Sequence, residues 1–193
     1  MYALVESGTI TKYFNRPKGF TLGELQYPAD IFMKWSVEEK EAIGIYEVVY
    51  DNSNFKDEKW YINTNQSFAF ADGVVTASYG TATAKAHADV TETRNGVEHT
   101  TLGLKTSLIK SLKINVANEL AKTDWYVTRN TEKSTAIPSS ISTHRDAVRT
   151  KQAEMETAII NASDTAALET LYTYTTTDGV QSRPLGELPV LES

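Results

Sequence analysis

The sequence predicts an α+β protein, in which a small antiparallel β-rich N-terminal domain is followed by a helical C-terminal part of two to three helices. In about the first hundred of the 193 residues, Tyr, Phe, Val, Ile and Thr are frequent between turn residues, which is the composition of short strands. Beyond residue 100 the spacing of apolar residues changes from about two towards about 3.6, the period of an α-helix. We expect a β-rich domain over residues 1–100, a helical hairpin region over 101–175 and an extended tail over 176–193.

The composition and charge exclude several classes of function. The chain is 40% hydrophobic and 23% charged, as in ordinary globular proteins, and its net charge of −6 argues against a nucleic-acid partner. No segment approaches the roughly 18 apolar residues of a membrane span, so we expect no membrane partner. The N-terminal stretch MYALVESGTITKYF lacks the pattern of a signal peptide, and we expect the mature chain to begin at Met1. The absence of cysteine excludes disulfides, thiol catalysis and zinc ribbons.

The first domain begins with a hairpin and a short helix. The segments MYALV and GTITKYF, on either side of residues 6–8, predict two strands joined by a tight turn. Ser36 and Glu39 have the spacing of a capping box, which predicts the start of a helix, and Gly44 fits its end. Residues 45–51, IYEVVYD, alternate in part between apolar and polar side chains and predict a third strand.

Two further strands are predicted around the dipeptide Asp72-Gly73, a strong hairpin signal in KWYINTNQSFAFADGVVTASYG. Residues 76–101 contain seven threonines and few large apolar side chains. This Thr-rich stretch is compatible with an edge strand, an extended arm or a linker, and Asn95-Gly96 marks a turn inside it. We place the domain boundary near residue 100.

The second half predicts helices. A helix over about 103–122 is indicated by apolar residues spaced by four, namely Leu104, Leu108, Leu112, Val116 and Leu120. A second helix is predicted over about 138–161, with Pro138 in its first turn, and a third begins near Asp164. If the first two helices pair as an antiparallel hairpin, both apolar stripes become buried. The connection between them, of about fifteen residues, is expected to be a loop.

Few residues suggest chemistry. His87 and Asp89 could place two metal ligands on one side of a strand, and Glu98, beside His99, could add a third. Their spacing matches no known zinc or iron motif, and we interpret them as residues of a solvated strand or turn. His144 has serines and Asp146 nearby in the sequence, which invites comparison with a catalytic triad. Neighbours on one helix rarely have that geometry. The chain also lacks the glycine-rich motifs that hold nucleotides. We therefore expect a protein that is not an enzyme and has no cofactor or metal.

The connection between the two long helices contains an acid and a tryptophan where the first helix ends. Helix C-termini carry partial negative charge, so Asp124 requires a nearby cation or a new helix start, and the candidate cations are Arg129, Arg145 and Arg149. We expect Asp124 to meet Arg145 or Arg149, and Trp125 to plug the open end of the helical hairpin. On this interpretation the main role of the joint is to fix the helix turn.

The stretch ANELAKTDWYVTRNTEKSTAIPSSISTHRDAVR, with its surroundings over roughly residues 101–161, resembles the C-terminal segment of bacteriophage tail fibre assembly proteins and related phage tail or fibre-associated structural proteins. The shared pattern is a helix end followed by Asp-Trp, a basic residue, a loop with Ile-Pro, and a helix with two arginines four residues apart. A weaker similarity lies in residues 27–48, YPADIFMKWSVEEKEAIGIYEV. In the family an aromatic residue such as Tyr precedes the first arginine, where this chain has His144.

The resemblance implies a structural joint and a role in binding a tail fibre. Its residues would be Asp124 and Trp125 at the helix end, the basic Arg129, Pro138 at the next helix start, and Arg145 and Arg149 in the first turns. The family supplies no catalytic residue and no cofactor. The implied partners are phage tail or tail fibre proteins in a multi-copy assembly, reached after synthesis in the host cytoplasm. Of a departing chaperone and a permanent part of the virion tail, we favour the latter.

Two alternatives remain open at this point. The first is a carbohydrate- or protein-binding module of non-viral origin, in which sheet aromatics face a ligand; the possible partner-binding aromatics are Trp35, Trp60 and Tyr61. The second is a small hydrolase, which would need acidic side chains of opposite environment meeting in a cleft. Exposure of the tryptophans would support the first alternative.

Overall fold

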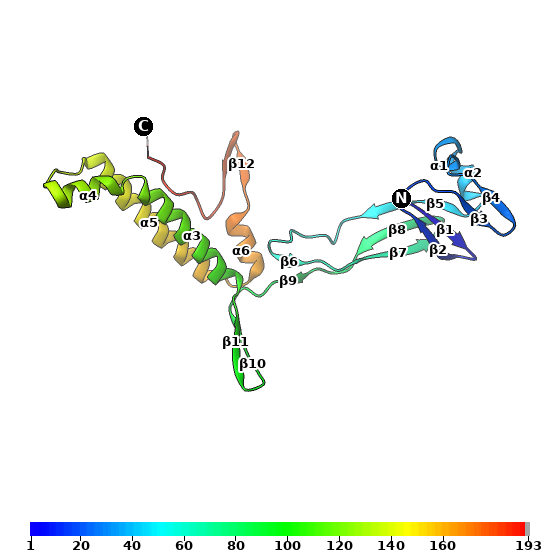
Figure 1. Cartoon of the computed structure of the whole chain (residues 1–193), viewed down its shortest axis with the longest axis horizontal. Coiled ribbons are helices and arrows are strands. Elements are labelled where there is room, and N and C mark those ends of the chain that lie inside the picture. The colour runs from blue at the N-terminus through cyan, green and yellow to red at the C-terminus, as the bar shows by residue number, and fades with distance from the viewer. Residues whose placement is uncertain (192–193) are drawn as a thin grey trace. The chain divides into compact units, whose positions relative to one another are not determined.

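A computed structural model describes residues 1–191, which form two compact units divided between Thr83 and Ala84 (Figure 1). The α+β class is confirmed, with strands concentrated in the first unit and helices in the second. The division falls earlier than the predicted boundary near residue 100, because most of the Thr-rich stretch belongs to the helical unit. Residues 192 and 193 of the predicted tail lie outside the described part of the chain.

The N-terminal unit contains a five-stranded sheet in the order β2-β1-β5-β8-β7. Its strands are β1 (Tyr2–Glu6), β2 (Thr9–Phe14), β5 (Ile45–Asp51), β7 (Gln66–Ala71) and β8 (Val74–Tyr79). Both predicted hairpins are present, and the turn residues Asp72 and Gly73 have positive φ angles of 51° and 78°. One neighbouring pair, β5 and β8, is parallel instead of antiparallel. Parallel pairing needs a long connection, and residues 52–73 supply it.

The sheet curls, since its two outermost strands approach each other. The rings of Tyr13 on β2 and Phe68 on β7 lie 4.8 Å apart although these strands are at opposite edges of the sheet. One face of the curl is closed by small and β-branched residues that are almost fully buried: Ala3, Val48, Val75 and Ala77. Small side chains at the centre of the curl allow the strands to bend around a narrow core.

The other face of the sheet is covered by short elements: β3 (Phe20–Leu22), β4 (Leu25–Tyr27), α1 (Ile31–Lys34) and α2 (Val37–Glu41). Phe14 from the sheet contacts Phe20 and Phe32, with ring centroids 4.9 and 5.1 Å apart. The predicted capping box is confirmed: Ser36 Oγ accepts from the Glu39 N–H at 3.2 Å, and Glu39 Oε2 accepts from the Ser36 N–H at 2.8 Å.

The second unit is built on two long antiparallel helices, α3 (Leu104–Ala121) and α5 (Ser139–Asn161), which lie side by side in Figure 1 as predicted. α6 (Thr165–Tyr172) starts after Asp164, whose side chain accepts from the Ala167 N–H at 2.8 Å. The structure adds a helix in the predicted loop, α4 (Asp124–Lys133). The second unit also contains the strands β10 (Val90–Arg94), β11 (Val97–Thr101), β12 (Thr175–Thr177) and β13 (Val180–Ser182). Two short strands remain: β6 (Tyr61–Ile62) in the first unit and β9 (Thr83–Ala84) at the division between the units.

The predicted turn at Asn95-Gly96 is confirmed: it closes a hairpin of β10 and β11, in which residues 90–101 of the Thr-rich stretch pair with each other and every strand residue is exposed. One prediction about an extended segment needs correction. The tail predicted as extended over residues 176–193 contains the hairpin β12–β13 around Asp178-Gly179. In both cases a residue of positive φ followed by glycine closes the turn, which is the signal that identifies tight hairpins.

Gly44 makes a testable contribution to the N-terminal unit. Its φ angle is +79°, and a Cβ at this position would lie 2.5 Å from the Val5 carbonyl oxygen on β1. Gly44→Ala is expected to lower the free energy of unfolding by about 2–4 kcal/mol, because a left-handed backbone and a steric clash both penalise the side chain. Urea unfolding followed by circular dichroism measures this change.

Gly8→Ala is the matched control, since Gly8 has a φ of +78° but no atom within 4 Å of the added Cβ. It is expected to cost about 1–2 kcal/mol, the backbone contribution alone. Equal losses for the two variants would contradict the close approach of Gly44 to β1.

Candidate functional site

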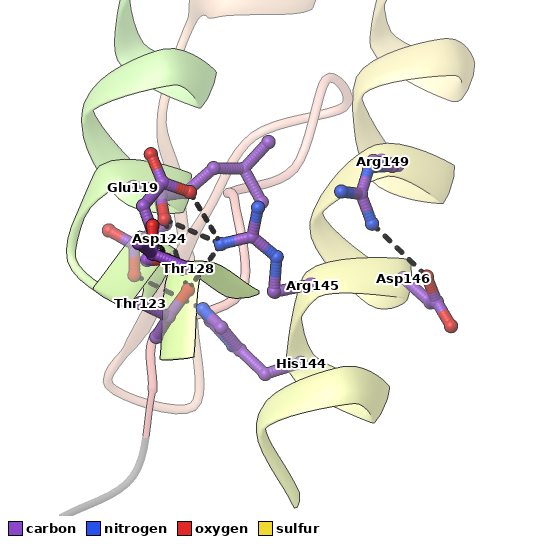
Figure 2. Close-up of polar contacts among 9 residues, drawn as sticks. Glu119, Thr123, Asp124, Thr128, His144, Arg145, Asp146 and Arg149 are labelled. Atoms are coloured by element: carbon purple, nitrogen blue, oxygen red, sulfur yellow. Dashed lines mark hydrogen bonds and ion pairs between the residues drawn. The ribbon is translucent and has the colours of Figure 1, made fainter. Parts of the chain in front are cut away.

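Arg145 of α5 connects three successive parts of the chain at the joint between α3 and α4. Its side chain is buried, with the residue 9% exposed. The terminal Nη1 atom lies 2.8 Å from the Leu120 carbonyl oxygen, 2.7 Å from Thr123 Oγ1 and 2.9 Å from Asp124 Oδ1. Figure 2 shows this side chain reaching from α5 to Thr123 and Asp124. A guanidinium carries only donors, so it suits a site made of acceptors.

Helix electrostatics explains why a cation lies here. The Leu120 carbonyl belongs to the last turn of α3, where carbonyls carry partial negative charge, and it also accepts from the Thr123 N–H at 3.1 Å and the Thr123 hydroxyl at 3.0 Å. Asp124 is the first residue of α4, so its carboxylate lies at the favourable, positive end of that helix. The predicted pairing of Asp124 with Arg145 is confirmed. Arg149 pairs instead with Asp146 at 3.2 Å on the surface of α5.

A second polar contact joins α3 to α5 beside this cluster. His144 Nε2 lies 3.3 Å from Glu119 Oε1, and both side chains are largely buried, with 7% and 12% exposure. The hydrogen bond from Lys122 holds the pKa of the Glu119 carboxyl below its usual value, and the charges of Lys122 and His144 act in the same direction. The carboxylate is therefore held in its ionised form between the two helices.

The arrangement around His144 differs from a catalytic triad. The histidine faces Glu119, which comes from the other helix, while Asp146 is engaged with Arg149. Ser142 Oγ donates to the Ser139 carbonyl oxygen at 3.0 Å within the first turn of α5. The hydroxyl and the acid that the sequence places near His144 thus have other partners.

Trp125 lies at the surface, contrary to the prediction that it plugs the helical hairpin. The residue is 52% exposed, and its ring centroid lies 4.0 Å from that of Tyr126. The Arg129 guanidinium stacks over both rings, 4.5 Å from the Trp125 centroid and 5.6 Å from the Tyr126 centroid. Because the segment is helical, Trp125 and Arg129 share one face of α4 by their spacing of four. We call Trp125, Tyr126 and Arg129 the aromatic platform.

The aromatics of the first unit are less accessible than the sequence suggested. Trp60 and Tyr61 are only 3% and 8% exposed, so the prediction that their rings are available to a partner is wrong. Trp35 is half-buried and packs edge-on against Tyr27 with centroids 5.9 Å apart. The composition predicts that most sheet aromatics belong to the core and that the rest could form an exposed patch. Among the predicted site residues the most exposed ring is Trp125 on α4, and not a ring of the sheet.

The remaining predicted residues have structural roles. Pro138 precedes α5, and its carbonyl oxygen accepts from the Ile141 N–H at 3.0 Å, as expected for a helix start. Asp89 Oδ1 accepts from the Gly103 N–H at 2.7 Å at the beginning of α3, and this bond lowers the pKa of the carboxyl. Within residues 1–191 no three His, Asp or Glu side chains are grouped as metal ligands, and no helix there has the length and apolar character to cross a membrane.

Sequence reasoning missed Glu119 and Thr123, and it missed α4 altogether. A signal for α4 was present, because Asp124 and Lys133 place an acid at the start and a base at the end of the segment. In comparisons with known proteins, no protein-family model, curated protein or solved structure matches the chain.

Removal of the Arg145 guanidinium is expected to destabilise the helical unit. Arg145→Ala should lower its free energy of unfolding by about 2–4 kcal/mol, because buried acceptors lose a charged donor. Arg145→Lys should recover only part of this loss, since a lysine presents a single point charge. Urea unfolding monitored by the helical signal of circular dichroism measures both variants.

Arg149→Ala is the matched control, because Arg149 is half-exposed and pairs with an exposed Asp146 on the same helix. Such pairs contribute about 0–1 kcal/mol. If Arg149→Ala were as costly as Arg145→Ala, the assignment of the joint to Arg145 would be wrong.

Glu119 should make stability depend on pH. Its pKa is lowered in the folded state from a model-compound value of 4.5, so the folded protein binds fewer protons and gains stability as pH rises. This contribution is present above the unfolded pKa and is lost as pH falls through the lower folded pKa. Glu119→Gln should therefore unfold more easily than the wild type at neutral pH, and the gap should close on acidification. Thermal unfolding across the acidic range tests this; a gap of constant size would contradict it.

Proposed function

We propose that this chain is a non-enzymatic bacteriophage tail protein, a structural component of the virion that connects or attaches tail fibres. The observation that carries the proposal is the aromatic platform of α4, in which Trp125 is 52% exposed and Tyr126 and Arg129 are partly buried. It lies within the stretch that resembles tail fibre assembly and related tail proteins. Trp, Tyr and Arg are also the residue types that contribute most of the energy in protein interfaces. The proposed partners are tail or tail fibre proteins, and the proposed location is the virion tail, after synthesis in the host cytoplasm.

The platform is well suited to binding because its geometry is already fixed. Arg129 stacks over Trp125 and Tyr126, which restricts all three side chains before a partner arrives. Pre-organised groups lose less conformational entropy on binding than free side chains do. Burial of an exposed tryptophan also removes a large apolar area from water, since aromatic side chains bury about 150–250 Å² each.

The joint supplies the connection between the platform and the rest of the helical unit. Asp124 precedes Trp125 directly and is held by Arg145 at 2.9 Å. Thr128, one turn further along α4, donates its hydroxyl to the Asp124 carbonyl oxygen at 3.3 Å. The direction in which α4 leaves α3, and therefore the direction of the platform, depends on a buried contact with α5. A rigid connection of this kind suits a protein that holds a fibre in a defined orientation.

The exposed Trp125 ring also favours a second candidate function, a carbohydrate- or protein-binding module of non-viral origin. Sugar rings stack on exposed tryptophans, and Trp125 is half-exposed. The difference between the two candidates lies in the partner. A sugar ligand would change the tryptophan fluorescence of the isolated chain, whereas a tail protein would bind the chain within a particle.

The proposed function predicts that the chain is present in purified phage particles produced from the genome that encodes it. Mass spectrometry should find it there, and Trp125→Ala should reduce its incorporation by about tenfold or more, as expected for loss of an interface hot spot. Tyr50→Ala, which removes a similarly exposed ring from β5, serves as the control and should leave incorporation unchanged. Absence of the wild-type chain from the particles would overturn the virion role. A sugar-dependent fluorescence change lost in Trp125→Ala would support the second candidate instead.

A further inference from the structure

The side of α3 that turns away from its contact with α5 forms a shallow apolar groove of about 430 Å³. We call it the α3 groove, and it is lined by Thr106, Ile109, Lys110, Lys113, Ile114 and Ala117. Ile114 is 54% exposed, which is unusual for a large aliphatic side chain in the middle of a helix. The buried residues of α3 are only Leu112 and Val116, so its contact with α5 leaves this second apolar stripe uncovered.

The outer side of α5 has the opposite character. We call it the α5 face; it is a hollow lined by Thr150, Ala153, Glu154, Thr157 and Ala158. Its side chains are small except for Glu154, whose side chain is 61% exposed and pairs at the surface with Lys151 of the same copy at 3.2 Å. The α3 groove presents large aliphatic side chains and lysines, whereas the α5 face presents small side chains and an acid. The two surfaces are therefore complementary in both size and charge.

We propose that copies of this chain associate head to tail, with the α5 face of one copy in the α3 groove of the next. The chain carries both halves of this interface, and α3 and α5 are both long enough for an extended helix contact, at about 27 and 35 Å. Pairing of two α3 grooves would bring lysines against lysines, and like charges across an interface are unfavourable. A head-to-tail interface uses two different surfaces on each copy, so it forms a ring when its rotation closes.

The positions of the charged residues along the helix axes fit such a ring. Within one copy, Lys113 Nζ lies 3.9 Å from Glu156 Oε1, so these residues are level on the two antiparallel helices. In a ring whose symmetry axis runs parallel to the helices, a given residue lies at the same position along that axis in every copy. Glu154 is two residues from Glu156, about 3 Å along the axis. Lys113 of one copy therefore comes within reach of Glu154 of the next, and Ile114 comes level with the small side chains around it.

The test is the oligomeric state of the purified full-length chain, measured by analytical ultracentrifugation over a range of concentration and salt. The wild type should associate, and more tightly at low salt. Lys113→Glu and Glu154→Lys should each weaken association by about tenfold or more, since each places like charges together. The double variant exchanges the two charges and should restore association. Both side chains are more than half exposed in the monomer, at 59% and 61%, so the fold is expected to persist, and circular dichroism checks this.

A second pair of variants tests the apolar part of the interface. Ile114→Asp should abolish association, because it places a charge in the floor of the α3 groove. Val37→Asp is the matched control: Val37 is 52% exposed, close to the 54% of Ile114, and it lies at the start of α2 in the other unit, where an acid is well tolerated.

Three results would overturn the proposal: a wild type that stays monomeric, association that is insensitive to Ile114→Asp, or a double charge variant that fails to recover. If the wild type is monomeric, the α3 groove does not bind a second copy of this chain, and its partner would have to be a different protein. The experiment uses the isolated chain, so its outcome is separate from that of the particle experiment on the aromatic platform.

Discussion

The helical unit depends on one buried guanidinium. Arg145 lies where three oxygen acceptors converge, and two of them, the Leu120 carbonyl and the Thr123 hydroxyl, are neutral groups. The ion pair with Asp124 is the weaker part of this interaction, because the Asp124 side chain is 60% exposed and water screens its charge. The two neutral acceptors are already engaged with each other, because Thr123 donates to the Leu120 carbonyl through its N–H and its hydroxyl. The larger effect is the charged donor that Arg145 adds to them, since a hydrogen bond to a charged group contributes about 1.5–3 kcal/mol. The contact determines where α3 ends and how α4 leaves it, so the position of the aromatic platform follows from it.

Local signals in the sequence were sufficient for most of the fold. The capping box at Ser36, the hairpin turn at Asp72-Gly73 and the apolar stripe of α3 each depend on residues a few positions apart, and the structure contains all three elements. The parallel pairing of β5 with β8 could not be predicted in this way. It depends on how a long connection returns to the sheet, and turn chemistry at one end of a strand carries no information about that path.

The parts of the candidate site that depend on charge could be predicted from the sequence, whereas the exposure of its aromatic side chains could not. An acid at a helix end requires a cation or a new helix start, and this argument identified Asp124 but left three arginines open as its partner; the structure selects Arg145. The same reasoning misplaced Trp125, because it assigned the ring to the core without knowing that the segment is helical. Once α4 forms, Trp125 shares a face with the partly buried Arg129, which stacks over its ring, and the ring remains 52% exposed. The burial of Trp60 likewise depends on long-range packing, which composition alone cannot reveal.

The thinness of the helical unit links its stability to its partners. α3 buries only Leu112 and Val116, and every residue of the hairpin β10–β11 is exposed, although an isolated two-stranded hairpin is marginally stable in water. Any partner that binds the folded form but not the unfolded chain stabilises it in proportion to the logarithm of its concentration. If copies associate through the α3 groove and a fibre covers the aromatic platform, assembly adds to the stability that the buried residues of α5 and α6 already supply. On the proposed function, such a protein would be most stable when assembled, because its binding contacts would add to the packing of its helices.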